Sequence, residues 1–206
     1  MHPEPASGTL TFLFTDLEGS TRLWERFPHD MKGALERHDS ILQAAVTASN
    51  GRVVKATGDG LMAVLGSAAD AVRACLTAQQ DLVDEPWPAT GALRVRMGLH
   101  AGEAQLRTDD YFGPTVIRAA RIMAVGHGGQ VLLSAATAAL VADQLPDGTT
   151  LLDLGAHRLK DLGRPEHLFQ LAHPALGHGF PPLATLDRRP NNLPTQTSTF
   201  IGGARS

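Results

Sequence analysis

The stretch Thr11-Phe-Leu-Phe-Thr-Asp-Leu-Glu-Gly-Ser-Thr21 carries the strongest information on the fold. A continuously apolar strand predicted here leads into Asp16, and Gly19-Ser20 then begins a helix. A second aspartate, Asp59, lies in Val54-Lys-Ala-Thr-Gly-Asp-Gly60, a glycine-flanked turn between two short apolar runs. Two carboxylates beside backbone amides form the surroundings in which hard cations and phosphates bind. If the fold brings the two aspartates together, the pair indicates a nucleotide-binding enzyme.

Apolar periodicity predicts alternating strands and helices along the rest of the chain. Pro28 separates two consecutive helices, and Asn50-Gly51 ends the second of them. Ser67, Pro114 and Ser134 each begin a further helix. Strands are predicted over residues 10–15, 52–56, 61–65, 93–100, 130–133, 149–154 and 167–171, and helices over 19–27, 67–84, 114–125 and 134–142 and between Pro28 and Asn50.

This order of elements indicates an α/β fold of the α+β sandwich type, with a ferredoxin-like βααββαβ core built on a split βαβ unit. The strands over 10–15 and 52–56 should then run parallel, with the strand over 61–65 between them. The end of the first strand and the tip of the 52–65 hairpin therefore share one edge of the sheet. Asp16 and Asp59 become neighbours by topology.

Composition and charge exclude several classes of partner. With a net charge of −3, the 206-residue chain has no field that would attract nucleic acid or an acidic membrane surface. The single cysteine, Cys75, excludes an internal disulfide and a cysteine-rich zinc site, and its helical spacing from Val72 and Leu82 predicts a buried thiol. No apolar run could span a membrane, and residues 1–8 lack the pattern of a secretory signal. We expect a cytoplasmic protein without nucleic-acid or membrane partners.

The chain is expected to hold one domain with a segment on either side. Residues 1–7 are expected to be a disordered N-terminus, and residues 8–172 carry the periodic elements. From residue 173 to residue 206 the composition shifts to Pro, Gly, His, Asn and Thr without periodicity, which is typical of a linker or tail.

Each aspartate alone also fits a structural role, because an aspartate before a helix is often an N-cap and Gly-Asp-Gly is often only a turn. Together at one sheet edge, Asp16 and Asp59 favour binding of divalent cations, which can lie about 4 Å apart as a two-metal clamp on phosphate. The backbone N–H groups of residues 18–21 are expected to hold the polyphosphate.

Five segments occur in an order and at a spacing that resemble the catalytic domain of the class III adenylate/guanylate cyclases, over roughly residues 8–172. Five linked motifs are far more specific than one. The segments are Phe12 to Thr21, Val54 to Gly66, Gly98-Leu-His-Ala-Gly-Glu103, Tyr111-Phe-Gly-Pro-Thr-Val-Ile-Arg-Ala-Ala-Arg-Ile122 and His157-Arg-Leu-Lys-Asp-Leu162.

The resemblance implies two Mg²⁺ or Mn²⁺ ions per site, held by Asp16, Asp59 and the backbone carbonyl of Leu17. It also implies a base-selecting pair, Lys55 and Asp110. Lysine donates to adenine N1 and aspartate accepts from the N6 amine, whereas guanine would mismatch both groups. Asp110 is chosen over Asp109 from its offset of three from Gly113. The phosphates are expected to contact Leu17, Glu18, Gly19, Ser20 and Thr21.

The helix beginning at Pro114 matches the family's catalytic helix with one departure. Arg121 matches the arginine that stabilises charge on the reacting phosphate. Ile117, one turn earlier on the same face, occupies the place where active members carry an asparagine that orients the ribose. Loss of such a contact costs on the order of 3 kcal/mol, or about a hundredfold in rate. Lys160 matches a lysine that reaches the triphosphate, and a solvated surface charge is the alternative.

The resemblance implies an adenylate cyclase that converts ATP to 3′,5′-cyclic AMP and pyrophosphate, with weak activity because of Ile117. In such a homodimer each site is composite, with Asp16 and Asp59 from one subunit and Lys55, Asp110 and Arg121 from the other. The alternative is a degenerate cyclase-like domain that acts as a nucleotide-binding or dimerising regulatory module. Residues 192–202 support that alternative, because they look like the junction before an ATPase module in multidomain regulators. A guanylate cyclase is disfavoured by the base-selecting pair.

Overall fold

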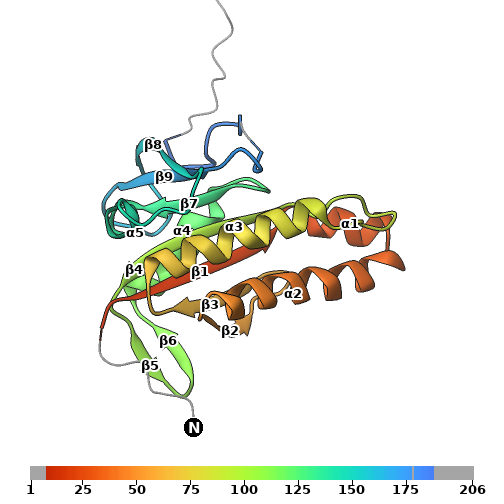
Figure 1. Ribbon diagram of the computed structural model, residues 1–206, viewed down its shortest axis with the longest axis horizontal. Coiled ribbons are helices and arrows are strands. Elements are labelled where there is room, and N and C mark those ends of the chain that lie inside the picture. The colour runs from red at the N-terminus through yellow and green to blue at the C-terminus, as the bar shows by residue number, and fades with distance from the viewer. Residues whose placement is uncertain (1–7, 178, 188–206) are drawn as a thin grey trace, which may run out of the picture.

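The computed structural model describes residues 8–177 and 179–187 of the chain, which form a seven-stranded mixed sheet with helices on both faces (Figure 1). In the described ranges no helix is both long and apolar enough to cross a bilayer. The elements are β1 (Leu10–Leu17), α1 (Ser20–Arg26), α2 (Asp30–Ala48), β2 (Arg52–Ala56), β3 (Leu61–Leu65), α3 (Ala68–Asp84), β4 (Val95–Gly102), β5 (Gln105–Arg107), β6 (Asp110–Phe112), α4 (Pro114–Ala124), β7 (Val131–Ser134), α5 (Ala135–Val141), β8 (Thr150–His157) and β9 (Glu166–Ala172).

The order of the large sheet is β2-β3-β1-β4-β7-β9-β8. β3 pairs antiparallel with both β1 and β2, so β1 and β2 run parallel with β3 between them. This arrangement confirms the predicted α+β sandwich with its split βαβ core. Because β2 and β3 form a hairpin, its tip lies at the edge where β1 ends.

β1 is buried on both of its faces, which explains why its sequence is continuously apolar. Leu13 and Leu17 pack in the core cluster that contains residues of α2 and α3, whereas Phe12 and Phe14 pack toward Ala119 of α4. Figure 1 shows α2 and α3 side by side on one face of the sheet. Successive side chains of a strand point to opposite faces, so an apolar run is needed where both faces are covered.

The predicted caps and the buried thiol are confirmed. The hydroxyls of Ser67 and Ser134 accept hydrogen bonds from the backbone N–H groups of Asp70 and Thr137, at the beginnings of α3 and α5. Each bond satisfies one of the N–H groups that have no partner within the helix. Cys75 is fully buried in α3, where burial raises the pKa of its thiol.

The shared edge is closed by a direct contact between β1 and the β2–β3 turn. A Cβ atom at Gly60 would lie 1.9 Å from the carbonyl oxygen of Thr15 and 3.0 Å from the Cα atom of Asp16. The backbone N–H of Leu61 donates to the Thr15 hydroxyl at 3.0 Å. Because Asp59 directly precedes Gly60, this contact fixes its backbone beside that of Asp16.

We expect Gly60→Ala to destabilise the protein, because the new methyl group must displace the β1 backbone. Overpacking of this kind costs about 1–3 kcal/mol. Gly66→Ala is the matched control, since a Cβ atom at Gly66 meets nothing within 4 Å. Urea unfolding should give a lower midpoint for Gly60→Ala only. Equal midpoints for the two variants would show that the Gly60 contact is not tight.

Two features of the fold were not predicted from the sequence. β5 and β6 form a separate two-stranded hairpin whose loop residues, Thr108 and Asp109, both have positive φ. The segment 179–187, for which the composition predicts a linker or tail, packs on the domain and is called the strap below. Leu183 of the strap is 7% exposed and packs with Ile122 and Leu159.

Hydrogen bonds also fix the strap. The N–H of Ala184 donates to the carbonyl of Val125 at 3.0 Å, and the N–H of Leu186 donates to the carbonyl of Arg158 at 3.1 Å. The N–H of Arg158 in turn donates to the Asp187 carboxylate at 2.7 Å. The predictions for residues 1–7 and 188–206 lie outside the described residues.

Candidate active site

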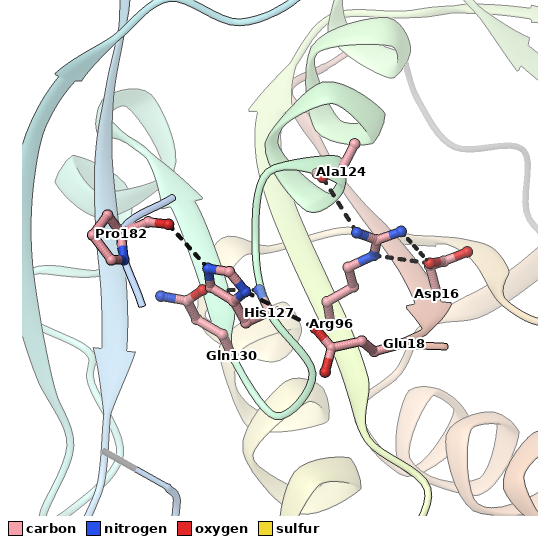
Figure 2. Close-up of polar contacts among 7 residues, drawn as sticks. All are labelled: Asp16, Glu18, Arg96, Ala124, His127, Gln130 and Pro182. Carbon is pink, nitrogen blue, oxygen red and sulfur yellow. Dashed lines mark hydrogen bonds and ion pairs between the residues drawn. The ribbon is translucent and has the colours of Figure 1, made fainter. Parts of the chain in front are cut away.

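Asp16 is half-buried at the end of β1 and is paired with an arginine of the neighbouring strand. Asp16 lies opposite Arg96 in the β1–β4 register. The Nη2 and Nε atoms of Arg96 lie 2.6 and 2.8 Å from Oδ2 of Asp16, and Nη1 donates to the carbonyl of Ala124 at 3.3 Å (Figure 2). Both contacts use the same oxygen, so Oδ1 of Asp16 has no partner among the residues that the structure describes.

Arg96 was missed in the sequence, although a signal was present. It lies in Val95-Arg-Met-Gly98, next to a quoted motif, and a basic residue in the strand that pairs with β1 is a natural partner for a carboxylate at that level. Because Arg96 also contacts the last residue of α4, it joins the Asp16 end of the site to the helix that carries Ile117 and Arg121.

The residues directly after Asp16 differ in what their backbone can bind. The N–H of Glu18 donates to the carbonyl of Arg94 at 2.9 Å. The amide of Glu18 is therefore already bonded within the chain and is not free to bind a phosphate, in contrast to the prediction. Along an antiparallel pair, the residues whose N–H and C=O groups bond to the neighbouring strand alternate with residues whose groups point the other way. Because Glu18 bonds to the strand segment before β4, the carbonyl of Leu17 points away from β4 and toward the side of the Asp59 turn. For Gly19, Ser20 and Thr21 the phosphate contact stays a prediction.

The side chain of Glu18 points away from Asp16 and toward the turn after α4 (Figure 2). Its Oε1 lies 3.9 Å from Nδ1 of His127, whose Nε2 lies 3.2 Å from the carbonyl of Pro182 in the strap. The backbone N–H of His127 donates to Oε1 of Gln130. The His127 side chain therefore lies between the strap and Glu18, which follows the end of β1 two residues after Asp16.

Lys55 and Asp110, the predicted base-selecting residues, lie together in the same chain. Nζ of Lys55 on β2 is 2.5 Å from Oδ2 of Asp110 on β6. The hydrogen bond from Lys55, together with that from the N–H of Tyr111, lowers the pKa of Asp110 below its ordinary value. Asp109, the rejected neighbour, is exposed in the β5–β6 loop instead. The Lys55 ammonium also lies 5.9 Å from the centre of the Phe112 ring.

Arg121 is held by the turn that carries Lys160. Nη2 of Arg121 lies 2.5 Å from Oδ2 of Asp161, a residue with positive φ. Lys160 itself is exposed and has no carboxylate within 4 Å among the described residues. Ile117 lies one turn before Arg121 and is 50% exposed. Half of this apolar side chain is therefore open to water in the single chain.

One chain does not bring all of these residues together. No hydrogen bond or ion pair in the described ranges joins Asp16 or Asp59 to Lys55, Asp110 or Arg121. No group of three His, Cys, Asp or Glu side chains in those ranges could hold a metal ion. Within one chain, the candidate site consists of separate ion pairs and of the sheet edge that carries Asp16 and Asp59, which is called the aspartate edge below.

His100, the histidine of Gly98-Leu-His-Ala-Gly-Glu103, is buried in the core. Its Nδ1 lies 2.7 Å from the Ser134 hydroxyl, which also contacts the hydroxyl of Thr137 at 3.0 Å. Burial, with a smaller effect of the Arg118 charge, lowers the pKa of His100 from 6.5 to about 4. A neutral, fully enclosed imidazole is a structural group.

Since the folded protein binds the His100 proton only near pH 4 and the unfolded chain binds it near pH 6.5, stability falls as the pH drops from 6.5 to 4. We expect this residue to account for about 2 kcal/mol of the free energy of unfolding lost between pH 7 and pH 5. His100→Gln should flatten that part of the urea-unfolding profile, whereas exposed His29→Gln should not. Identical acid profiles for all three proteins would contradict the assignment.

A family model described as the adenylate and guanylate cyclase catalytic domain matches residues 3–169. The chain therefore belongs to the class III adenylate and guanylate cyclase catalytic domain family. An uncharacterized protein of Mycobacterium tuberculosis strain H37Rv is 42% identical over 201 residues, which cover 96% of this chain and 68% of that protein. The adenylate cyclase of Neurospora crassa is 29% identical over 84% of this chain, but the match spans only 10% of that enzyme.

Solved structures agree with the family. An adenylate cyclase structure from Trypanosoma brucei, in its monomeric state, matches 90% of this chain and 97% of that chain with a TM-score of 0.77 and 29% identity. An adenylate/guanylate cyclase/hydrolase structure from Silicibacter pomeroyi matches 79% of this chain and 95% of that chain with a TM-score of 0.71 and 28% identity.

Proposed function

We propose that the chain is an adenylate cyclase, in which the ribose 3′-hydroxyl of ATP attacks the α-phosphorus to give 3′,5′-cyclic AMP and pyrophosphate. The observation that carries this proposal is the Gly60 contact, which fixes Asp59 beside Asp16 at one edge of the sheet. Among the described residues no side chain bridges the two carboxylates, and a carboxylate pair in that position suits a metal–nucleotide complex.

The residues at this edge fit divalent cations. Carboxylate and carbonyl oxygens are the ligands of hard cations, and Asp16, Asp59 and the Leu17 carbonyl supply them. The contact of Arg96 with only one oxygen of Asp16 leaves Oδ1 available to a metal. Bound there, Mg²⁺ or Mn²⁺ would lower the pKa of the ribose hydroxyl and offset charge on the phosphates.

Selection of adenine is assigned to Lys55 and Asp110. The ammonium donates to ring N1 and the carboxylate accepts from the N6 amine. The lowered pKa keeps Asp110 ionised, and an ionised carboxylate is an acceptor only. Their 2.5 Å contact supports the pairing, since the two groups must open only slightly to admit the edge of a base.

The phosphates are assigned to Arg121, Lys160 and the backbone N–H groups of Gly19, Ser20 and Thr21. Arg121 donates to the reacting phosphate, where charge develops in the transition state. Its ion pair with Asp161 must open for this step, so the 158–161 turn has to move when substrate binds. Lys160, which follows the buried Leu159, would then approach the triphosphate.

We further propose a homodimer with two equivalent composite sites, each with Asp16 and Asp59 from one subunit and Lys55, Asp110 and Arg121 from the other. Apolar side chains that are exposed in the single chain support a second copy as the covering partner. They are Leu106 on β5, Phe112 on β6 and Ile117 on α4.

A degenerate regulatory module is the second candidate, favoured by the exposed apolar Ile117 where a polar ribose contact is expected. The deciding experiment measures cyclic AMP formed from Mn-ATP by the purified chain, with Asp59→Ala as the background. Product above that background supports the enzyme, and product equal to it supports the module. A parallel assay with Mn-GTP tests the base assignment, because a guanylate cyclase would prefer that substrate.

A further inference from the structure

The strap joins the end of α4 to the turn that carries Lys160. Near the middle of the strap, the N–H of Ala184 donates to the carbonyl of Val125, the C-cap residue of α4, at 3.0 Å. At the end of the strap, the carboxylate of Asp187 accepts a hydrogen bond from the backbone N–H of Arg158, where the turn begins. The strap therefore connects the candidate catalytic helix directly with the turn, although the two are far apart in the sequence.

Both backbone groups of Arg158 are bonded to the strap. Its N–H donates to Oδ2 of Asp187 at 2.7 Å, and its carbonyl accepts from the N–H of Leu186 at 3.1 Å. The last residue pair between β8 and β9 is His157 with Glu166, so Arg158 has already left the sheet. Backbone polar groups need partners wherever the chain runs. The strap supplies the partners that the sheet no longer offers at this point.

Few other contacts hold this turn in place. Leu159 is buried and packs in one apolar cluster with Leu183 of the strap. In the part of the chain that the structure describes, the polar contacts of the turn to other elements are those with the strap and the ion pair between Arg121 and Asp161. That ion pair must open when Arg121 donates to a phosphate. The strap is then the remaining polar anchor, and it holds the base of the turn while the tip moves.

We propose that Asp187 is a positioning residue of the cyclase site, which holds the 158–161 turn so that Lys160 reaches the triphosphate of the bound nucleotide. The role rests on the proposed function, because it concerns the same site. The one residue between Arg158 and Lys160 is the buried Leu159, so the position of the first residue determines that of the second. A turn that is anchored for only a fraction of the time presents Lys160 correctly for only that fraction, and the apparent affinity for the nucleotide falls accordingly.

The test compares the steady-state kinetics of cyclic AMP formation from Mn-ATP by the full chain and by its Asp187→Ala variant. We expect KM to rise at least fivefold while kcat changes less than twofold, because loss of a contact made equally to substrate and transition state acts on KM alone. Asp187→Asn keeps an acceptor for the N–H of Arg158 and should keep the wild-type KM. Asp153→Ala is the matched control, since the exposed Asp153 carboxylate also accepts from a backbone N–H, that of Gly155 at 2.7 Å, away from the turn.

Two further measurements separate a positioning role from a merely structural one. Lys160→Gln should itself raise KM, and adding Asp187→Ala to it should raise KM no further, because two residues that act through one contact are not additive. Hydrogen exchange of the proteins without substrate follows the anchor directly. The amides of Arg158 and Leu186 should exchange faster in Asp187→Ala than in the wild type or in Asp187→Asn. Thermal unfolding checks that every variant is folded at the assay temperature.

Equal KM values for Asp187→Ala and Asp153→Ala would overturn the positioning role while leaving the cyclase activity in place. A KM for Asp187→Asn as high as that for Asp187→Ala would overturn it too, and so would a further rise in KM when Asp187→Ala is added to Lys160→Gln. If the wild type forms no cyclic AMP, the proposed function fails instead. The dissociation constant of Mn-3′-deoxy-ATP, which has no 3′-hydroxyl to react, then replaces KM in the same comparison. A wild type that does not bind this nucleotide would contradict the role of Asp187 as well.

Discussion

Asp59→Ala is expected to lower the rate of cyclic AMP formation from Mn-ATP by about a thousandfold, to the limit of the assay. Several kcal/mol of charge stabilisation are lost when a metal-binding carboxylate is removed, and each 1.36 kcal/mol is tenfold in rate. The variant should fold normally, because Asp59 lies in a turn and no hydrogen bond in the described residues depends on its side chain. Electron paramagnetic resonance of Mn²⁺ should show weaker metal binding in parallel.

The matched control for this prediction is Asp143→Ala, which removes an exposed carboxylate far along the chain, after α5. Its activity and Mn²⁺ affinity should equal those of the wild type. If Asp59→Ala binds Mn²⁺ as tightly as this control does, the aspartate edge is not a metal site. If Asp59→Ala binds Mn²⁺ poorly and the wild type makes no cyclic AMP, the metal site is supported and the cyclase activity is contradicted.

Ile117→Asn is expected to raise the turnover of Mn-ATP by about a hundredfold. The polar side chain would restore a transition-state contact worth on the order of 3 kcal/mol, and such a contact acts on kcat rather than on KM. The substitution should fold without strain, because Ile117 is half exposed on α4 and asparagine is no larger than isoleucine. Steady-state kinetics of cyclic AMP formation give the two constants separately.

Ile117→Val separates this effect from a change at the subunit interface. Valine keeps the exposed position apolar and offers no hydrogen bond, so its kcat should match that of the wild type. Sedimentation of both variants checks that the oligomeric state is the same. An unchanged kcat for Ile117→Asn in an unaltered oligomer would mean that position 117 does not explain slow turnover.

The central part of the fold could be predicted because its signals are local and agree with one another. β1 is apolar on both faces, the β2–β3 turn is Thr-Gly-Asp-Gly, and Ser67 caps α3. Once β1 and β2 are parallel, the meeting of Asp16 and Asp59 follows from topology alone. No comparable signal marks β5 and β6, which are three residues each and turn through Thr108 and Asp109.

The polar contacts of the site depend on distances that sequence spacing does not contain. Arg96 meets Asp16 because β4 happens to be the strand beside β1 and in that register. Asp161 meets Arg121 only after the chain has passed through β7, α5 and β8. The same limit applies to the strap, whose sequence lacks periodicity and whose packing depends on a few side chains such as Leu183.

The strap changes where the domain can be cut. A fragment that ends at residue 172, the boundary suggested by composition, would lose Leu183 and expose the apolar cluster around Ile122 to water. It would also leave the carbonyls of Val125 and Arg158 without their partners, beside the end of α4 and the turn of Lys160. Loss of activity in such a fragment would therefore result from the missing strap and not from a change of any active-site residue. The shortest fragment that keeps the contacts of the strap ends after Asp187.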